Sequence, residues 1–201
     1  MRHIQTIAAC ALLLGSSVVA RAADKAPVAA PPTAAPSAGA APATPPAPAP
    51  APELDALMKG FEGSWKCDTK FAANALGPGS PEFSAKSTVK IKKELNGFWY
   101  RGEYEIKKTK AMPGFKGYFF IGYDPGSKQA LITGIDAMGG LTSGTGAITG
   151  TSVTFVEEGY MGGMKIKSRE AMELRDKSPF HKFEIDMGKG FQPMGEDTCK
   201  K

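Results

Sequence analysis

The sequence contains few of the residues on which enzyme and metal sites depend. It has two histidines, His3 and His181, and three cysteines, Cys10, Cys67 and Cys199. It has no Gly-x-Ser-x-Gly element, and nucleophilic catalysis needs a nucleophile, a base and an orienting group. A two-cysteine metal site needs further His or Cys ligands, and few are present. We therefore expect no catalytic residues, no resident cofactor and no metal site.

Strong charge and long hydrophobic runs are also missing. The chain has 25 Lys and Arg against 20 Asp and Glu, a formal net charge of +5. This excess is too mild for a protein dedicated to nucleic-acid binding. After residue 23 no apolar run approaches the roughly 18 residues of a transmembrane helix. We expect neither a nucleic-acid partner nor a transmembrane span in the mature chain.

The first 22 residues have the parts of a secretory signal peptide. Arg2 supplies a positive start, residues 7–20 carry no charge, and Ala20-Arg21-Ala22 fits the small-x-small cleavage pattern. We expect an exported protein, periplasmic or extracellular, that begins at Ala23. The run that ends in Cys10 looks like a lipoprotein box, but the six residues before it are too few for the usual hydrophobic stretch. Lipid anchoring at Cys10 is therefore not expected.

Residues 23–52 are low in everything that builds a core. They hold 23 Ala or Pro in 30 positions and no aromatic residue. Proline fixes φ and removes amide donors, so this segment is predicted to be a disordered linker that samples extended polyproline II. At about 3.1 Å per residue it would span roughly 90 Å. It is either a stalk that lifts the domain from a surface or a tail without a specific task.

Residues 53–201 are predicted to form one domain in which period-two alternation dominates. Leu54, Leu57, Met58 and Phe61 have the spacing of one face of a short helix. Asn-Gly at 96–97 between two alternating runs is the strongest short-range signal for a β-hairpin. Nine or ten strands are expected, at about 64–71, 86–95, 98–107, 117–123, 128–137, 141–148, 152–157, 164–174, 180–187 and 196–200.

Even strand spacing with short Gly- and Asp-containing turns favours an all-β, up-and-down antiparallel barrel, with a sandwich as the main rival. Cys67 falls on the first strand and Cys199 on the last, and these strands are neighbours in a closed barrel. An even number of cysteines in an exported chain suggests a disulfide between them. Two free thiols, or a metal pair with His181, are the alternatives.

Several short motifs resemble a known family. The helix followed by Gly63-Ser64-Trp65 resembles the opening of lipocalin-like (calycin) barrels, in which this Trp caps the barrel base. Four further motifs resemble a lipocalin-like bacterial group catalogued only as a domain of unknown function: Leu95-Asn96-Gly97-Phe98-Trp99, Gly122-Tyr123-Asp124, Asp136-x-x-Gly139 and Cys199-x-Lys201. The resemblance implies a barrel that can hold a small apolar molecule and implies no activity. No last-strand Arg is present to stack on Trp65.

Aromatic residues are the candidate ligand site. A barrel of this size has room either for packed side chains or for one small ligand. Tyrosine and phenylalanine supply the apolar surface and few polar groups that ligand sites use. A dry core is the alternative reading. The candidate interior residues are Trp65, Phe98, Tyr100, Tyr104, Phe119 and Tyr123.

The remaining candidates are polar. His181 is interpreted as a half-exposed strand or turn residue. Nitrobindin-like barrels, which also open with Gly-x-Trp, would make it a haem ligand, but their ligand lies on the last strand and His181 falls one strand earlier. Glu157 and Glu158 are interpreted as solvated strand positions, as are Glu103 and Glu105.

Lysines gather around the hairpin at 96–97, from Lys86, Lys90, Lys92 and Lys93 to Lys107, Lys108 and Lys110. Ordinary protection of a sheet edge by lysine explains them, or they bind anionic envelope polymers. The leading hypothesis is a secreted, non-catalytic barrel that binds a small apolar or amphipathic ligand. The alternative is a structural or interaction module of the bacterial envelope that uses this Lys-rich face.

Overall fold

The structure is a computed structural model that describes residues 47–201. The predicted signal peptide, the question of Cys10 and most of the predicted linker lie outside these residues. No helix in the described part is long and apolar enough to cross a membrane. The elements are α1 (Pro52–Met58), β1 (Gly63–Phe71), β2 (Phe83–Glu94), η1 (Leu95–Gly97), β3 (Trp99–Ile106), β4 (Phe115–Asp124), β5 (Gln129–Asp136), β6 (Leu141–Thr149), β7 (Ser152–Met161), β8 (Met164–Arg175), β9 (Ser178–Asp186) and β10 (Gln192–Lys200).

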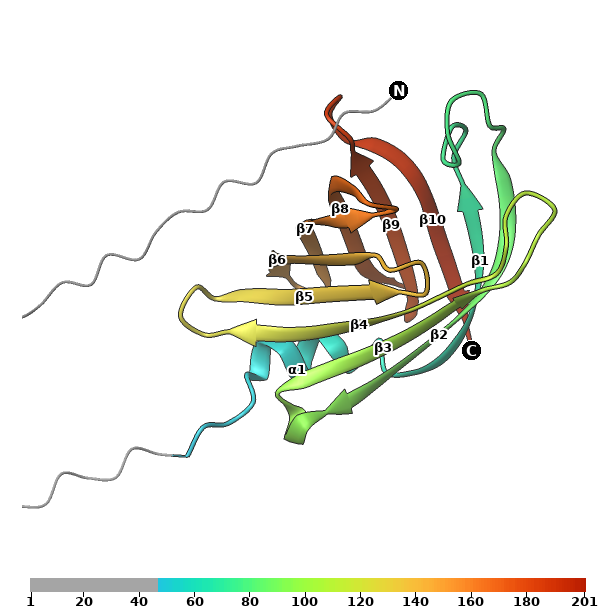
Figure 1. Ribbon diagram of the computed structural model, residues 1–201. Helices are drawn as coiled ribbons and strands as arrows, with labels where there is room; N and C mark the ends of the chain where they lie inside the picture. The colour runs from blue at the N-terminus through green and yellow to red at the C-terminus, as the bar shows by residue number, and fades with distance from the viewer. Residues whose placement is uncertain (1–46) are drawn as a thin grey trace, which may run out of the picture. The chain divides into compact units, whose positions relative to one another are not determined.

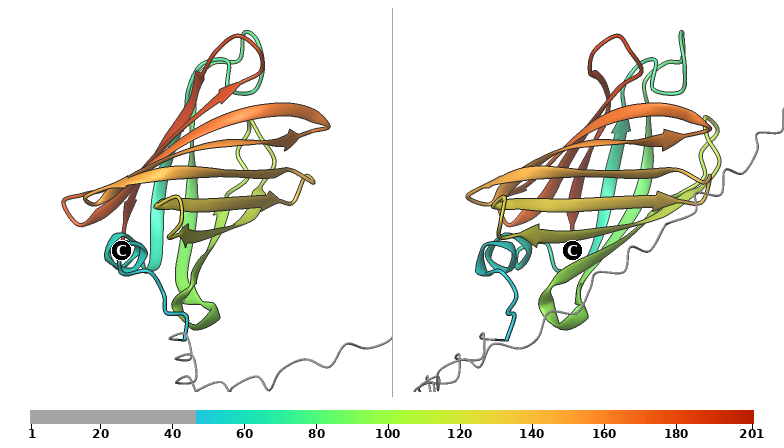
Figure 2. Two further views of the ribbon diagram at one scale, coloured as in Figure 1. Left: turned by 90° about the vertical axis from the view of Figure 1, so that its left-hand side faces the viewer. Right: turned by 60° about the vertical axis from the view of Figure 1, so that its left-hand side comes forward.

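The ten strands form one closed antiparallel barrel, which confirms the predicted fold class. Each strand pairs with the next along the chain, and β1 pairs with β10 to close the sheet. Figures 1 and 2 show that β4–β7 cross β1, β2 and β10 at a steep angle, as expected for a strongly twisted sheet. Closure leaves no free edge in the sheet.

The seam between the first and last strands carries the predicted disulfide. Cys67 of β1 lies directly opposite Cys199 of β10, and the two are joined across a sequence separation of 132 residues. The bridge is buried beside Trp65. The prediction of a Cys67–Cys199 disulfide is confirmed, and the free-thiol and metal-pair alternatives are wrong.

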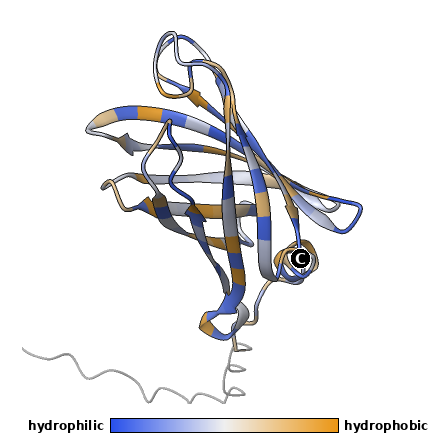
Figure 3. Ribbon diagram, turned by 90° about the vertical axis from the view of Figure 1, so that its right-hand side faces the viewer, coloured by the Kyte–Doolittle hydropathy of each residue, from blue (hydrophilic) through white to orange (hydrophobic). Residues whose placement is uncertain are grey.

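Period-two alternation explains why these segments are strands. On β2, Ser87 and Ile91 are buried, whereas Lys86 and Lys90 are exposed. Figure 3 shows the same alternation of hydrophilic and hydrophobic residues along the strands. The hairpin predicted at residues 96–97 is present as the β2–β3 pair joined by η1.

Helix α1 lies at one end of the barrel (Figures 1 and 2). Its apolar face, predicted from the spacing of Leu54, Leu57 and Met58, is buried. Tyr100 of β3 is fully buried in the same core, and its hydroxyl donates a hydrogen bond to Asp55 Oδ1 at 2.7 Å. The helix therefore fills this end. The core cluster comprises Leu54, Leu57, Met58, Phe61, Ile91, Tyr100, Ile121, Ala130, Ile132, Val153, Phe155 and Met172.

Trp65 joins the filled end to the closing seam. Its indole Nε1 donates to the carbonyl of Phe61 at 2.7 Å, and its ring is buried. The ammonium of Lys201 lies 5.0 Å from the ring centroid. The last strand has no Arg to stack on this Trp. Lys201, which follows β10, supplies a cation in its place.

Gly102 on β3 is needed for packing inside the barrel. The ring of Phe119 occupies the place of its missing side chain, so that an added Cβ would lie 1.9 Å from Phe119 Cζ. We expect Gly102→Ala to lower the free energy of unfolding by about 1–3 kcal/mol, because the ring must move in a packed core. Urea denaturation measures this change. Gly114→Ala is the control, since its nearest contact is an ordinary 3.5 Å, and equal effects of the two variants would contradict the prediction.

Candidate functional site

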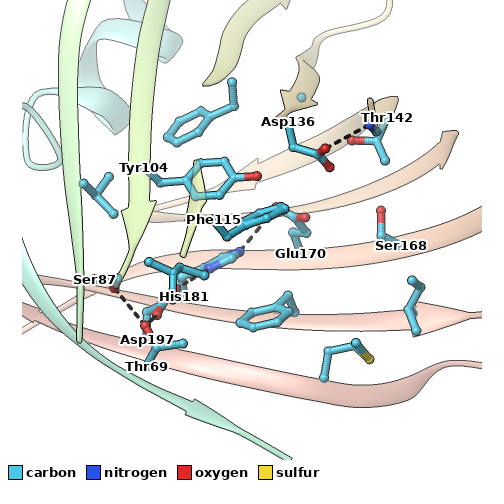
Figure 4. Close-up of a pocket in the computed structure, with 18 of the residues that line it drawn as sticks. Thr69, Ser87, Tyr104, Phe115, Asp136, Thr142, Ser168, Glu170, His181 and Asp197 are labelled. Carbon is cyan, nitrogen blue, oxygen red and sulfur yellow. Dashed lines mark hydrogen bonds and ion pairs between the residues drawn. The ribbon is translucent and has the colours of Figure 1, made fainter. Parts of the chain in front are cut away.

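The half of the barrel away from α1 is hollow. A cavity of about 350 Å³ lies between the packed core and the far end of the strands, and every strand of the barrel contributes to its wall. Figure 4 shows side chains from several strands directed into it. This volume is within the range of sites for small organic molecules.

Most of the cavity wall is apolar. Phe61, Ile132 and Met172 form part of both the core cluster and the wall, so they separate the filled end from the hollow one. Other large apolar side chains on the wall include Trp65, Phe71, Val89, Ile91, Ile106, Phe115, Phe119, Ile166, Phe180, Phe183 and Ile185.

The mouth of the cavity is also apolar. Leu76, Met138, Leu141 and Tyr160 line the cavity and are nevertheless 48–60% exposed. They lie in or beside the β1–β2, β5–β6 and β7–β8 connections, at the opposite end from α1. Exposed apolar residues gathered at one opening are typical of a surface that contacts something apolar.

A chain of polar side chains crosses the interior from β8 through β9, β10 and β1 to β2. His181 Nδ1 lies 3.1 Å from Asp197 Oδ2, and His181 Nε2 lies 3.3 Å from Glu170 Oε2. The hydroxyl of Thr69 donates to Asp197 Oδ1 at 2.5 Å and lies 2.8 Å from the hydroxyl of Ser87. Alternation places all of these side chains on the inner face of their strands (Figure 4).

The protonated form of His181 is favoured in this setting. Burial by itself lowers the pKa of its imidazole, but hydrogen bonds to Asp197 and Glu170 outweigh burial and raise the pKa to about 10. The ring therefore carries a positive charge at neutral pH and donates from both nitrogens to carboxylates. His181 lies on β9, one strand before the last, and neither nitrogen is free to ligate a haem iron. Within residues 47–201, no group of three or more His, Cys, Asp or Glu side chains is arranged to hold a metal ion.

Glu157 corrects the sequence analysis. It was expected at a solvated strand position, but it points inward from β7 and is only 1% exposed, whereas Glu158 is exposed as expected. Its Oε1 and the hydroxyl of Ser168, directly opposite on β8, are buried without a hydrogen-bond partner in the described part of the chain. Burial, followed by repulsion from Glu170, raises the pKa of Glu157 to about 8.

The structure divides the six aromatic residues predicted for the interior. Trp65, Tyr104 and Phe119 line the cavity. Tyr100 and Tyr123 pack instead in or against the core cluster under α1. Phe98 is half-buried next to η1, away from the cavity.

Sequence reasoning missed the polar side of the site. Glu157 follows buried Val153 and Phe155 at a spacing of two residues on β7, so that it shares their face of the strand. Asp197 shares a face of β10 with buried Cys199 in the same way. This phase of the alternation places both carboxylates inside the barrel. The alternation alone therefore predicts the inward positions. Carboxylates normally prefer water, and this preference led to the outward assignment.

Comparison with known proteins supports the fold and leaves the chemistry open. No curated protein matches the sequence. The crystal structure of Rv2717c from M. tuberculosis is similar, with a TM-score of 0.57 at 11% identity over 76% of this chain and 99% of that one. At this identity the likeness shows the fold alone. Residues 51–187 match the family model described as protein of unknown function (DUF1579). Because the match covers more than half of the chain, this protein belongs to the DUF1579 family.

Proposed function

We propose that this protein is a non-catalytic carrier or receptor that binds one small amphipathic molecule inside its barrel. The observation that carries the proposal is the cavity of about 350 Å³, which has an apolar wall on most sides and a polar group set on β7–β10. An amphipathic ligand matches this division, because its apolar part is buried against the wall while its polar group meets the hydrogen-bonding side chains.

Unsatisfied polar atoms support the same proposal. Leaving a buried donor or acceptor without a partner costs about 1–3 kcal/mol. Glu157 Oε1 and Ser168 Oγ are two such atoms on neighbouring strands. A ligand whose polar group reaches both would recover this free energy on binding.

The geometry gives no support to catalysis at His181. A histidine that activates a nucleophile has one nitrogen on an orienting carboxylate and the other on the nucleophile. Here both nitrogens face carboxylates, Asp197 on one side and Glu170 on the other. The neighbouring hydroxyl of Thr69 donates to Asp197 and not to the imidazole. We therefore assign the histidine a binding and structural role.

The Lys-rich face receives little support as a site for anionic envelope polymers. Lys86 pairs with Asp68, Lys93 with Asp55, and Lys107 lies 2.7 Å from Glu105. Ion pairs of this kind compensate much of the positive charge on the face. The barrel interior remains the better candidate.

Native mass spectrometry tests the proposal. We expect the purified protein to retain or take up one lipid-like molecule from a broad panel of amphiphiles, with one site per chain. Gly134→Leu is expected to abolish uptake, because Gly134 lines the cavity and a leucine side chain there would occupy it, with the side chain of Thr142, whose Oγ1 lies 3.0 Å from the added Cβ, turned aside. Thr133→Leu on the opposite face of β5 is the control and should bind normally. Failure of the unmodified protein to bind any member would refute the proposal.

A further inference from the structure

The charges inside the cavity are of one sign apart from His181. The acidic residues on the wall come from five strands: Asp136, Glu157, Glu170, Glu184 and Asp197. Alternation on β9 turns the side chain of Glu184 to the outer face, where it pairs with Lys182 and Arg169, so that four carboxylates face the interior. No Lys or Arg within residues 47–201 lines the cavity. The interior of this basic protein therefore selects for positive charge.

Only some of these carboxylates already have a cationic partner. Glu184 pairs with Arg169 at 2.6 Å, and that pair reaches the outer surface. Glu170 and Asp197 share the single charge of His181 between them. Two carboxylates around one imidazolium leave a net negative charge, to which Glu157 adds only when it is ionised.

The buried atoms without partners lie beside this excess of negative charge. Glu157 and Ser168 are 1% and 7% exposed, and both face the cavity. A carboxylate oxygen and a hydroxyl accept hydrogen bonds, and an ammonium group has three N–H donors to offer. Phe115 and Tyr104 lie next to Glu170 in Figure 4, and aromatic faces attract cations.

We propose that the occupant of the cavity is a cationic amphiphile, a primary amine on an apolar chain, whose ammonium donates to Glu157 Oε1 and Ser168 Oγ. This inference rests on the proposed function and specifies the ligand class for the same cavity. The apolar chain lies against the wall formed by residues such as Phe119 and Ile166. A fatty acid is disfavoured, because its carboxylate would face Glu157, Glu170 and Asp197 without a free cation.

Binding of the amine should be linked to loss of a proton. Burial and Glu170 raise the pKa of Glu157 to about 8, so this carboxyl is mostly protonated at pH 7 in the free protein. An ammonium beside it favours the ionised form, and the affinity should rise between pH 6 and 8. The titratable groups that face Glu157 are Glu170 on β8, His181 on β9, Asp136 on β5 and Tyr104 on β3, with Asp197 behind His181 on β10.

Calorimetric titration of the full protein with octylamine, octan-1-ol and octanoate tests this inference at matched chain length. At pH 7 we expect octylamine to bind about tenfold more tightly than octan-1-ol, with octanoate weakest, since a charge-assisted hydrogen bond is about twice as strong as a neutral one. Glu157→Gln should reduce the preference for the amine over the alcohol to about twofold while the alcohol still binds. Glu158→Gln, on the outer face of the same strand, should leave the preference unchanged.

The outcomes separate the two proposals. Equal affinity for amine and alcohol, or tighter binding of octanoate, overturns the cationic ligand class and leaves the proposed function standing. A Glu157→Gln protein that is folded and keeps the full amine preference also overturns it. Binding of none of the three ligands, nor of any in the wider amphiphile panel, overturns the proposed function itself.

Discussion

Replacing Cys67 and Cys199 together with alanine is expected to lower the free energy of unfolding by about 2–5 kcal/mol. The bridge joins the first and last strands at directly paired positions and spans 132 residues of sequence. In the chain-entropy account, a cross-link over so long a loop restricts the unfolded chain strongly. The same bond holds the seam at which the barrel closes, so its loss should also promote opening between β1 and β10.

Urea denaturation of the oxidised protein, the reduced protein and the double variant measures this effect. The reduced protein and the double variant should agree with each other, and the reducing agent should not change the variant. A shift below about 1 kcal/mol in both would show that sheet pairing alone, without the covalent bond, maintains closure.

We expect the ligand-free protein to become less stable as pH rises from about 5 to 10. The folded-state pKa of Glu157 is raised from 4.5 to about 8, and that of His181 from 6.5 to about 10. A group whose pKa is raised by folding contributes stability below its unfolded pKa and loses it as pH rises through the folded pKa. Both groups therefore lower the free energy of unfolding as the pH rises. The expected loss is several kcal/mol, since each pH unit between the unfolded and the folded pKa of a group is worth about 1.4 kcal/mol.

The isosteric variant Glu157→Gln isolates the first of the two groups. It removes the titration near pH 8 and should make the profile flatter between about pH 4.5 and 8, leaving the decline due to His181 above about pH 6.5. Chemical denaturation at a series of pH values gives both profiles. A native protein more stable at pH 9 than at pH 5 would contradict the assignment of Glu157 as a buried, protonated acid.

The strands were predictable because alternation is a strong local signal. A period of two fixes which residues face inward, and Asn-Gly at 96–97 marks a hairpin independently. Cys67 and Cys199 could be paired because an up-and-down sheet that closes must bring its first and last strands together. These inferences needed only local pattern and topology.

The division of the interior was not predictable from the same pattern. Tyr100 and Tyr104 share a face of β3, yet Tyr100 packs under α1 and Tyr104 lines the cavity. Their environments differ because the two residues lie at different positions along the barrel axis, and α1 fills only one end of the barrel. The position of a residue along the barrel axis depends on the tilt and stagger of all ten strands, so it cannot be predicted from the sequence of a single strand.

The burial of Glu157 shows where chemical preference misleads. A carboxylate normally stays in water because burying its charge is costly. Here the alternation of β7 overrides that preference, and the neutral form of the acid makes burial tolerable. A carboxyl group placed against its preference inside a half-empty barrel is the kind of local conflict that marks functional sites.

A crystal structure of the protein soaked with octan-1-ol tests most directly whether the half of the barrel away from α1 accepts a ligand. We expect one alkyl chain in the cavity, with its hydroxyl beside Glu157 and Ser168 and its tail against Phe119 and Ile166. An interior closed by inward-packed side chains, with no alcohol at saturating concentration, would contradict it.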